Sequence, residues 1–224
     1  MRSWKASLAI VCLCLTTLVA GAEPAELPDI SLPAPRMEGG KPLMQALKER
    51  QSTRTFRPEK LSVQVLSDLL WAATGVNRPD SGKRTVPSAR DWQEIEVYAA
   101  TEDGVYLYDP KANVLKAVVG GDQRKLTGIQ DFVASAPLNL IYVADTTKMV
   151  VKTASGTVPA TDSLDLYVGA DTGFISQNVY LFCASDGLIT VVRATVDRAV
   201  LAKTLNFPDT KRITLVQTVG YPEK

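Results

Sequence analysis

The sequence contains no histidine in its 224 residues. This absence excludes Ser-His-Asp and Cys-His catalysis, histidine-ligated zinc, haem with a proximal histidine, and proton transfer through an imidazole. Hydride and electron transfer, by contrast, are usually carried by a bound cofactor while the protein supplies binding and orientation. We therefore expect that, if the protein is an enzyme, a cofactor carries its reaction.

Cysteine is almost as scarce, with three residues in the chain. Cys12 and Cys14 fall within an N-terminal apolar run, which leaves Cys183 alone in the remainder. A single thiol can form neither an internal disulfide nor a thiolate metal cage. Because Cys183 stands in the apolar stretch of residues 179–184, where burial raises the pKa of a thiol, we interpret it as a core residue.

The first 22 residues show the three regions of a secretory signal peptide. Arg2 and Lys5 give a positive start, an apolar run covers residues 6–19, and Ala20-Gly21-Ala22 offers a cleavage site of small residues. The alternative is a membrane anchor, but about 14 apolar residues fall short of the roughly 20 that span a bilayer. We expect cleavage after Ala22, export to the periplasm or the extracellular space, and no stable membrane insertion of the mature chain. No Arg-Arg pair marks a twin-arginine signal, so the chain is expected to cross the membrane unfolded.

The charge balance shows no basic excess. The chain has 25 basic and 24 acidic residues, and two of the basic residues lie in the predicted signal peptide. The mature chain would keep 23 basic against 24 acidic residues, a formal charge of −1. We therefore expect neither nucleic acid nor an anionic membrane surface as a partner.

The mature chain divides into a short arm and one domain. Residues 23–40 are rich in proline and poor in bulky apolar side chains, so they are predicted to form an extended, mobile arm. Residues 41–224 suffice for one domain with a substantial core. Periodicity predicts helices over residues 42–50, 62–75, 122–132, 163–185 and 197–205, and strands over 95–100, 105–108, 114–118, 138–144, 189–194 and 212–219. Residues 77–92 are expected to form a long, functional loop and 145–160 a flexible connection. The predicted helices and strands are mixed along the chain without strict alternation, which indicates the α+β class.

The predicted helix over residues 163–185 is apolar on nearly all sides. Such a helix is normally buried all round. In one domain of this size, that burial is easier when a second subunit covers part of the helix, so we expect a homodimer.

Three short motifs could bind a ligand. In Arg50-Gln51-Ser52-Thr53-Arg54-Thr55-Phe56, an extended backbone would turn Arg50, Ser52 and Arg54 to one side, where guanidinium groups can bind phosphate oxygens. Spacing alone favours the simpler alternative, an exposed edge strand. The stretch of residues 84–93 could bring backbone amides close to a planar ligand or form an ordinary surface turn. Asp186-Gly187-Leu188 is explained by a helix C-cap alone.

Together and in this order, the motifs resemble the nitroreductase family, in its small single-domain branch, over residues 43–222. The segment Arg50–Phe56 is similar to the family's Arg-Arg-Ser-x-Arg-x-Phe opening. Pro87-Ser88-Ala89 followed by Gln93 is similar to its Pro-Ser-x-x-Asn-x-Gln loop. Asp186-Gly187-Leu188 is similar to the turn after its long helix, and residues 217–222 to its closing strand with Gly-Tyr-Pro.

The resemblance implies an α+β fold with a central antiparallel or mixed sheet and long central helices. It also implies an interlocked homodimer with one FMN at each of two shared interfaces. Arg50 and Arg54 would hold the FMN phosphate, Ser52 the ribityl chain or ring edge, and Pro87, Ser88 and Ala89 would line the isoalloxazine. The implied cofactor-binding residues are Arg50, Gln51, Ser52, Arg54, Pro87, Ser88, Ala89, Asp91, Asp186, Gly187, Leu188 and Lys224.

Two departures from the family pattern bear on these roles. Asp91 stands where the family commonly has asparagine, so a group able to donate becomes an ionised acceptor. The basic residues that reach the phosphate in many relatives have no clear equivalent here, and Lys224 or Arg193 could take their place.

The implied reaction is a ping-pong hydride transfer from NAD(P)H through FMN to a small acceptor such as a nitro compound or a quinone. Nicotinamides are cytoplasmic molecules, so an exported enzyme would need another donor, or would act as a dehydrogenase on an external substrate. Two further alternatives are a flavin-binding dimer without turnover and a structural dimer that binds nothing.

Overall fold

The computed structural model describes residues 27–223, so the predicted signal peptide and Lys224 lie outside the described residues. The helices are α1 (Leu43–Glu49), α2 (Val63–Thr74), α3 (Phe132–Ser135), α4 (Leu164–Asp186) and α5 (Arg198–Thr204), with 3-10 turns η1 (Ala89–Asp91), η2 (Arg124–Thr127) and η3 (Thr146–Lys148). The strands are β1 (Ile30–Ser31), β2 (Val76–Arg78), β3 (Lys83–Arg84), β4 (Ile95–Ala100), β5 (Gly104–Asp109), β6 (Val114–Gly120), β7 (Leu138–Asp145), β8 (Val150–Thr153), β9 (Gly156–Pro159), β10 (Ile189–Arg193) and β11 (Lys211–Gly220).

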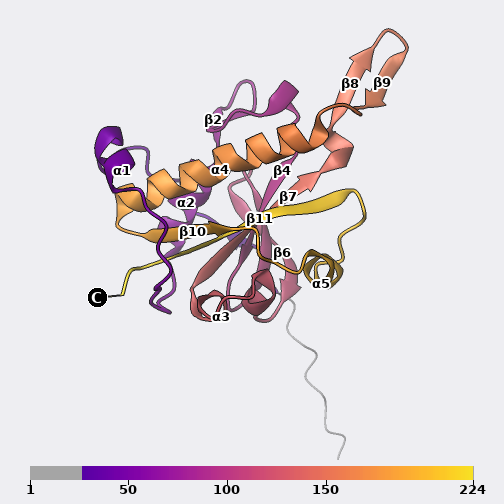
Figure 1. The fold of residues 1–224 in the computed structure, drawn as a ribbon. Coiled ribbons are helices and arrows are strands. Elements are labelled where there is room, and N and C mark those ends of the chain that lie inside the picture. The colour runs from indigo at the N-terminus through magenta and orange to yellow at the C-terminus, as the bar shows by residue number, and fades with distance from the viewer. Residues whose placement is uncertain (1–26, 224) are drawn as a thin grey trace, which may run out of the picture.

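Seven strands form one sheet in the order β1-β6-β5-β4-β7-β11-β10. Every neighbouring pair in it is antiparallel, and the central strands β4, β7 and β11 are not consecutive in the chain. Helices pack on both faces of this sheet (Figure 1). The predicted α+β class with an antiparallel central sheet is confirmed.

Side-chain alternation along the central strands builds two cores. Val97 and Leu140 face α2 and α4, whereas their neighbours Tyr98 and Ile141 face Leu201 of α5. The sequences of β4 and β7 are almost continuously apolar because both faces of these strands are covered. The longest helix, α4, therefore lies on the face opposite α5.

Capping residues mark the ends of α2 and α4. The Ser62 hydroxyl accepts a hydrogen bond from the Val65 backbone N–H (3.2 Å) at the start of α2. Gly75 ends α2, and Gly187 ends α4 with a left-handed φ of 74°. The predicted boundaries of α4 differ from the observed ones by a single residue at each end.

The prediction of a mobile arm before residue 41 is wrong for the part that the structure describes. Ile30 pairs with Leu115 at the sheet edge, and Leu32 is buried against the core. The Ser67 hydroxyl donates to the Pro33 carbonyl (2.6 Å), and Arg36 binds Asp68 through its backbone N–H and its guanidinium group. We refer to residues 30–36 as the N-terminal strap.

Three other segments also differ from their predicted form. Residues 145–160 are a turn and the β8–β9 hairpin, which projects from the body in Figure 1, and not a flexible connection. The predicted helix over 122–132 is interrupted at Gly128, where the backbone is extended (φ 171°), leaving η2 and α3. The loop over 77–92 contains the β2–β3 hairpin and η1.

Candidate functional site

The long helix α4 carries the candidate site. Its inward side buries a row of polar residues, Asp171, Thr172, Ser176 and Tyr180, within an otherwise apolar core. Buried polar groups need hydrogen-bond partners, so each of these positions ties α4 to another element or opens toward a cavity. Two of the cavities along the helix are lined by residues of the predicted motifs, one beside its middle and one at its C-terminal end.

The cavity at the C-terminal end of α4 has a volume of about 430 Å³, and we call it the basic cavity. Three cations from α1 and the residues on either side of it, Lys41, Lys48 and Arg50, face it. Lys41 is held in place because its Nζ donates to the Ala184 carbonyl (3.0 Å) and pairs with Glu49 (2.6 Å). The remaining lining residues are Glu49, Gln51, Thr53, Tyr180, Cys183, Ala184, Gly187, Leu188, Ile189 and Thr190.

Tyr180 organises the wall of the basic cavity. The Arg50 guanidinium lies over the Tyr180 ring, 5.2 Å from its centroid, and has no ion pair among residues 27–223. The Tyr180 hydroxyl accepts from the Val192 backbone N–H (2.9 Å) and is bonded to the Ser52 hydroxyl (2.8 Å). A cation and a hydroxyl therefore stand side by side at fixed positions, with donors available to an anion.

The predicted clamp is only partly assembled in one chain. Arg50, Gln51 and Ser52 converge on the basic cavity and Tyr180, but Arg54 is exposed and does not line it. The segment is not a regular strand: Thr53 donates to the Thr190 carbonyl (3.1 Å), and only Phe56 forms a bridge, to Pro222. The strict side-to-side alternation on which the prediction rested therefore does not hold for Arg54.

The turn after α4 contributes backbone to the same cavity. Gly187 and the buried Leu188 line it, and both N–H groups point back to the Cys183 carbonyl. Asp186, also predicted to bind the cofactor, is exposed and does not line the cavity. Cys183 is buried, and burial raises the pKa of its thiol, as expected for a core residue.

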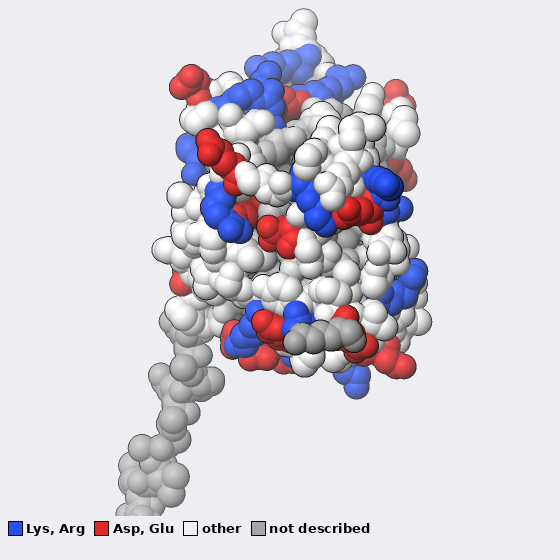
Figure 2. Space-filling view, turned by 90° about the vertical axis from the view of Figure 1, so that its left-hand side faces the viewer, with Lys and Arg blue, Asp and Glu red and all other residues white. Residues whose placement is uncertain are grey.

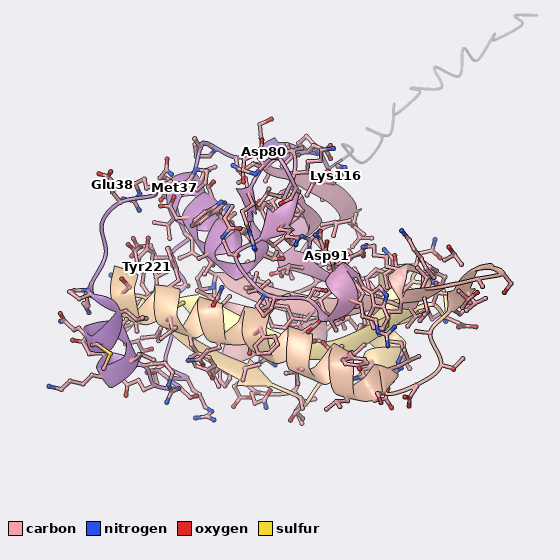
Figure 3. The ribbon with its side chains drawn as sticks, turned by 90° about the horizontal axis from the view of Figure 1, so that it is seen from above. Met37, Glu38, Asp80, Asp91, Lys116 and Tyr221 are labelled. Carbon is pink, nitrogen blue, oxygen red and sulfur yellow. The ribbon has the colours of Figure 1, made fainter. Side chains whose placement is uncertain are left out.

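The second cavity has a volume of about 310 Å³, and we call it the loop cavity. Pro87, Ser88 and Asp91 line it, and the Ala89 N–H beside them donates to the Asp171 carboxylate of α4 (2.8 Å). Figure 3 shows Asp91 next to α4, away from the end of that helix near α1. The other lining residues are Thr74, Arg78, Lys83, Arg84, Val86, Gln93, Glu94, Ile95, Asp171 and Ile175.

The two cavities are separate in one chain. Ile175 lines the loop cavity and Tyr180 the basic cavity. At a rise of about 1.5 Å per residue, these positions lie roughly 7.5 Å apart along α4. Within the described chain, the residues predicted to hold the phosphate and those predicted to line the ring therefore lie at different cavities.

Arg193 does not reach either cavity. Its guanidinium is buried and donates to the Thr127 carbonyl, Asn139 and Thr218, while burial lowers its pKa to about 10. The structure therefore rules it out as a phosphate ligand, and Lys224, the other candidate, lies outside the described residues.

Sequence reasoning missed Tyr180, Glu94 and Asp171. Tyr180 and Asp171 stand in the apolar helix, and a polar group among apolar neighbours was the signal for both. Glu94 precedes a buried strand and is itself fully buried. No pattern in the sequence links it to Asp171.

Within residues 27–223, acidic and sulfur side chains form no cluster of three that could hold a metal ion. In the same part of the chain, none of the helices has the length and apolar character needed to cross a bilayer. On the face seen in Figure 2, acidic and basic side chains are interspersed with wide uncharged areas.

Comparison with known proteins identifies the family. The family model of the Nitroreductase family matches residues 47–221. A protein of Methanocaldococcus jannaschii that is named as a nitroreductase is 33% identical over 162 residues, which cover 66% of this chain and 76% of that protein.

Solved structures give the same result. A crystal structure of a protein from Ralstonia eutropha, also named as a nitroreductase, superposes with a TM-score of 0.80 at 39% identity, over 88% of this chain and 90% of that one. The NADPH:FMN oxidoreductase of Vibrio harveyi, solved with NAD+, shares the fold with a TM-score of 0.60 at 16% identity, over 81% and 69% of the two chains. The extent of the family match, the relatives above 30% identity and the arrangement around α4 agree: the chain belongs to the nitroreductase family.

Proposed function

We propose that the protein is an FMN-dependent oxidoreductase that acts as a homodimer and passes hydride from a reduced nicotinamide or another donor to a small acceptor. Membership of the nitroreductase family supports an oxidoreductase. A protein with the same fold is named an NADPH:FMN oxidoreductase, which supports the cofactor and one class of donor. The observation that carries the proposal is the basic cavity, where Arg50 and Ser52 are held by Tyr180.

The donor set of the basic cavity fits the phosphate of FMN. Arg50 has no carboxylate partner in residues 27–223, so its guanidinium is available to an anion. The cation of Lys48 lines the same cavity, and the hydroxyl of Ser52 is bonded to Tyr180 in the wall of that cavity. Guanidinium and hydroxyl groups are typical phosphate ligands in proteins.

A dimer would bring the two cavities onto one ligand. The outward side of α4 exposes Leu166 (69%) and Phe174 (46%), and α1 beside it exposes Leu43, Met44 and Leu47. In Figure 1 this side of α4 is not covered by any other element. Apolar side chains gathered on one face favour a protein partner. A second copy seated there would place the loop cavity of one subunit opposite the basic cavity of the other.

Bound FMN would accept a hydride at its ring and pass it on, without a required protein acid or base. Arg50 and Ser52 would fix the phosphate and so set the depth of the ring in the site. Ser88 and the backbone around Ala89 would contact the ring from the partner subunit. Asp91 can only accept hydrogen bonds when ionised, and here it accepts from the Gln93 amide (3.2 Å).

Titration of the apo-protein with FMN, followed by flavin fluorescence, tests the cofactor and its anchor. A charge-assisted contact to phosphate is worth about 1.5–3 kcal/mol, so Arg50→Ala is expected to weaken binding by roughly tenfold or more. Lys203→Ala removes an exposed charge from α5 on the opposite face and should leave the affinity unchanged. Equal affinities for the two variants would exclude Arg50 as the anchor.

Two measurements separate the alternatives. A visible spectrum of the purified protein with a flavin band excludes a structural dimer that binds nothing. Turnover of a reduced nicotinamide with a nitroaromatic or a quinone then separates an enzyme from a flavin binder. Turnover that occurs only with an artificial donor would point to a dehydrogenase acting on an external substrate.

We also propose that residues 1–22 direct export. The support is the pattern of charge, apolar run and small residues in the sequence. Mass spectrometry of the protein from fractionated cells should find an N-terminus at Glu23 outside the cytoplasm. Protein that begins at Met1 and carries FMN in the soluble cytoplasmic fraction would contradict export.

A further inference from the structure

The Pro87–Gln93 loop, which lines the loop cavity, has an unusual backbone. Arg90, Asp91 and Gln93 adopt left-handed φ values of 52°, 57° and 50°. Residues with a Cβ are uncommon in this region because the side chain approaches the backbone, and three of them within four positions cost free energy. Other contacts must hold the loop in this form.

The restraining contacts converge on two carboxyl groups. The Ser88 hydroxyl accepts from the Gln93 N–H (2.8 Å) and donates to the Glu94 carboxyl (3.2 Å). The Ala89 N–H donates to Asp171 on α4 (2.8 Å). Glu94 thus fixes one side of the loop and Asp171 the other.

These two carboxyl groups are buried next to each other. Glu94 is 0% exposed and Asp171 4% exposed, both line the loop cavity, and their carboxyl groups bind the consecutive loop residues Ser88 and Ala89. Neither has an ion pair in residues 27–223, and Glu94 Oε1 has no hydrogen-bond partner there. Ionising two neighbouring carboxyl groups that are both buried and lack a cationic partner costs much free energy, so one of them keeps a proton.

The groups around the pair do not neutralise it. The β2–β3 hairpin brings Arg78, Lys83 and Arg84 to the other wall of the loop cavity, α2 brings the uncharged Thr74, and the loop itself brings Asp91. Burial, and after it the charge of Asp171, raises the pKa of Glu94 to about 7. The proton is therefore held at pH 6 and lost above neutrality.

We propose that Glu94 and Asp171 are positioning residues that share one proton, and that this shared proton holds the Pro87–Gln93 loop in its left-handed form. When the proton leaves, the two carboxylates repel each other and the anchors on Ser88 and Ala89 loosen together. The consequence for catalysis rests on the proposed function: the loop that would face the flavin keeps its left-handed conformation below neutral pH and loses it above neutral pH.

Trp92 reports on the loop without any ligand. Its indole N–H donates to the Val150 carbonyl (2.6 Å), and its ring meets Tyr167 edge-on at 5.7 Å. The full chain labelled with 5-fluorotryptophan contains three tryptophans, and Trp92→Phe assigns the resonance of interest. Trp71, bonded to the Val76 carbonyl outside the loop, is the internal reference.

The expected result is a shift of the Trp92 resonance between pH 5.5 and 9 with a midpoint near 7, while the Trp71 resonance stays in place. Glu94→Gln copies the protonated form and should abolish the transition. The matched control is Glu96→Gln, because Glu96 is bound by Lys148 and Lys211 (2.8 Å each), which lower its pKa against the effect of burial. This control should keep the transition.

A second variant covers the case in which Glu94→Gln does not fold. Asp171→Asn removes the neighbouring charge and should lower the midpoint by about one pH unit or more. A Trp92 resonance that does not respond to pH, or a midpoint that is unchanged in Asp171→Asn, would overturn the proposal.

FMN affinity measured over the same pH range links the pair to the site. We expect affinity to fall by about tenfold from pH 6 to pH 8.5 in the wild type and to stay level in Glu94→Gln. A protein whose Trp92 resonance shifts with pH as expected but that binds no FMN at any pH would refute the proposed function and leave the proposed role of the carboxyl pair supported. A protein that binds FMN but whose Trp92 resonance does not shift with pH would refute the role of the carboxyl pair and leave the proposed function supported.

Discussion

Arg193 and Arg50 are both arginines near the C-terminal half of α4, but the surroundings of their guanidinium groups differ. Arg193 is 6% exposed and is surrounded by acceptors, including the Thr127 carbonyl, Asn139 and Thr218. Arg50 is half-exposed, its guanidinium lies over the Tyr180 ring, and it has no side-chain hydrogen bond or ion pair within residues 27–223. A buried guanidinium that donates to several protein acceptors holds the fold together, whereas a half-exposed one without such acceptors can recognise a ligand.

We expect Arg193→Leu to lower the free energy of unfolding by about 3 kcal/mol or more. Hydrogen bonds to a charged group contribute about 1.5–3 kcal/mol each, and the change leaves the buried acceptors without a donor. Urea unfolding measures the loss. Arg212→Leu is the control, since its ion pair with Asp165 is exposed (50% and 84%) and should cost less than about 1 kcal/mol. Similar losses in the two variants would show that Arg193 is not structural.

The sequence can single out residues where a motif is local. Arg50, Ser52 and Ser88 were named as candidates because their neighbours along the chain define their motif. Asp171 was missed because its partner Ala89 lies 82 positions away, and only the packing of α4 on the loop brings them together. Arg54 does not line the basic cavity, because its segment forms a single bridge and lacks the regular alternation of an extended strand.

Among the elements, those with a buried apolar face or a buried apolar run were predicted almost to the residue. The stripe of α2 and the apolar runs of β4 and β7 mark their structure directly, because burial selects apolar residues at fixed spacing. The β8–β9 hairpin was missed because its residues are nearly all exposed, so no alternation records its strands. The strap was missed because its one strand is two residues long.

Removal of the N-terminal strap should destabilise the domain by about 3 kcal/mol or more. Leu32 leaves the core, and the Asp68 carboxylate, whose side chain is 2% exposed, loses the Arg36 partner and stays buried. Urea unfolding of a chain that begins at residue 37 measures the effect. A chain that begins at residue 27 keeps every one of these contacts and serves as the control. Equal free energies of unfolding for the two chains would mean that the strap does not stabilise the domain.

At the scale of the whole molecule, we expect the outward side of α4 to decide the oligomeric state. Phe174→Lys places a charge on that side and should give a monomer that has lost most of its affinity for FMN. Light scattering at low micromolar concentration, with FMN titration on the same samples, tests both effects. Val200→Lys changes an equally exposed apolar residue (46%) on α5, across the sheet, and should remain a dimer that binds FMN. A Phe174→Lys protein that stays dimeric would place the interface elsewhere.

The order of the strands has a consequence for the moment at which the fold can form during synthesis. β11, the final strand, lies between β7 and β10, and β10 has no other neighbour in the sheet. Until β11 has been made, β7 lacks one of its two partners and β10 lacks its partner in the described sheet. A nascent chain of this topology therefore has no finished core before β11 has been synthesised. If residues 1–22 direct export, as proposed above, the export machinery would engage them while the rest of the chain is still unfolded.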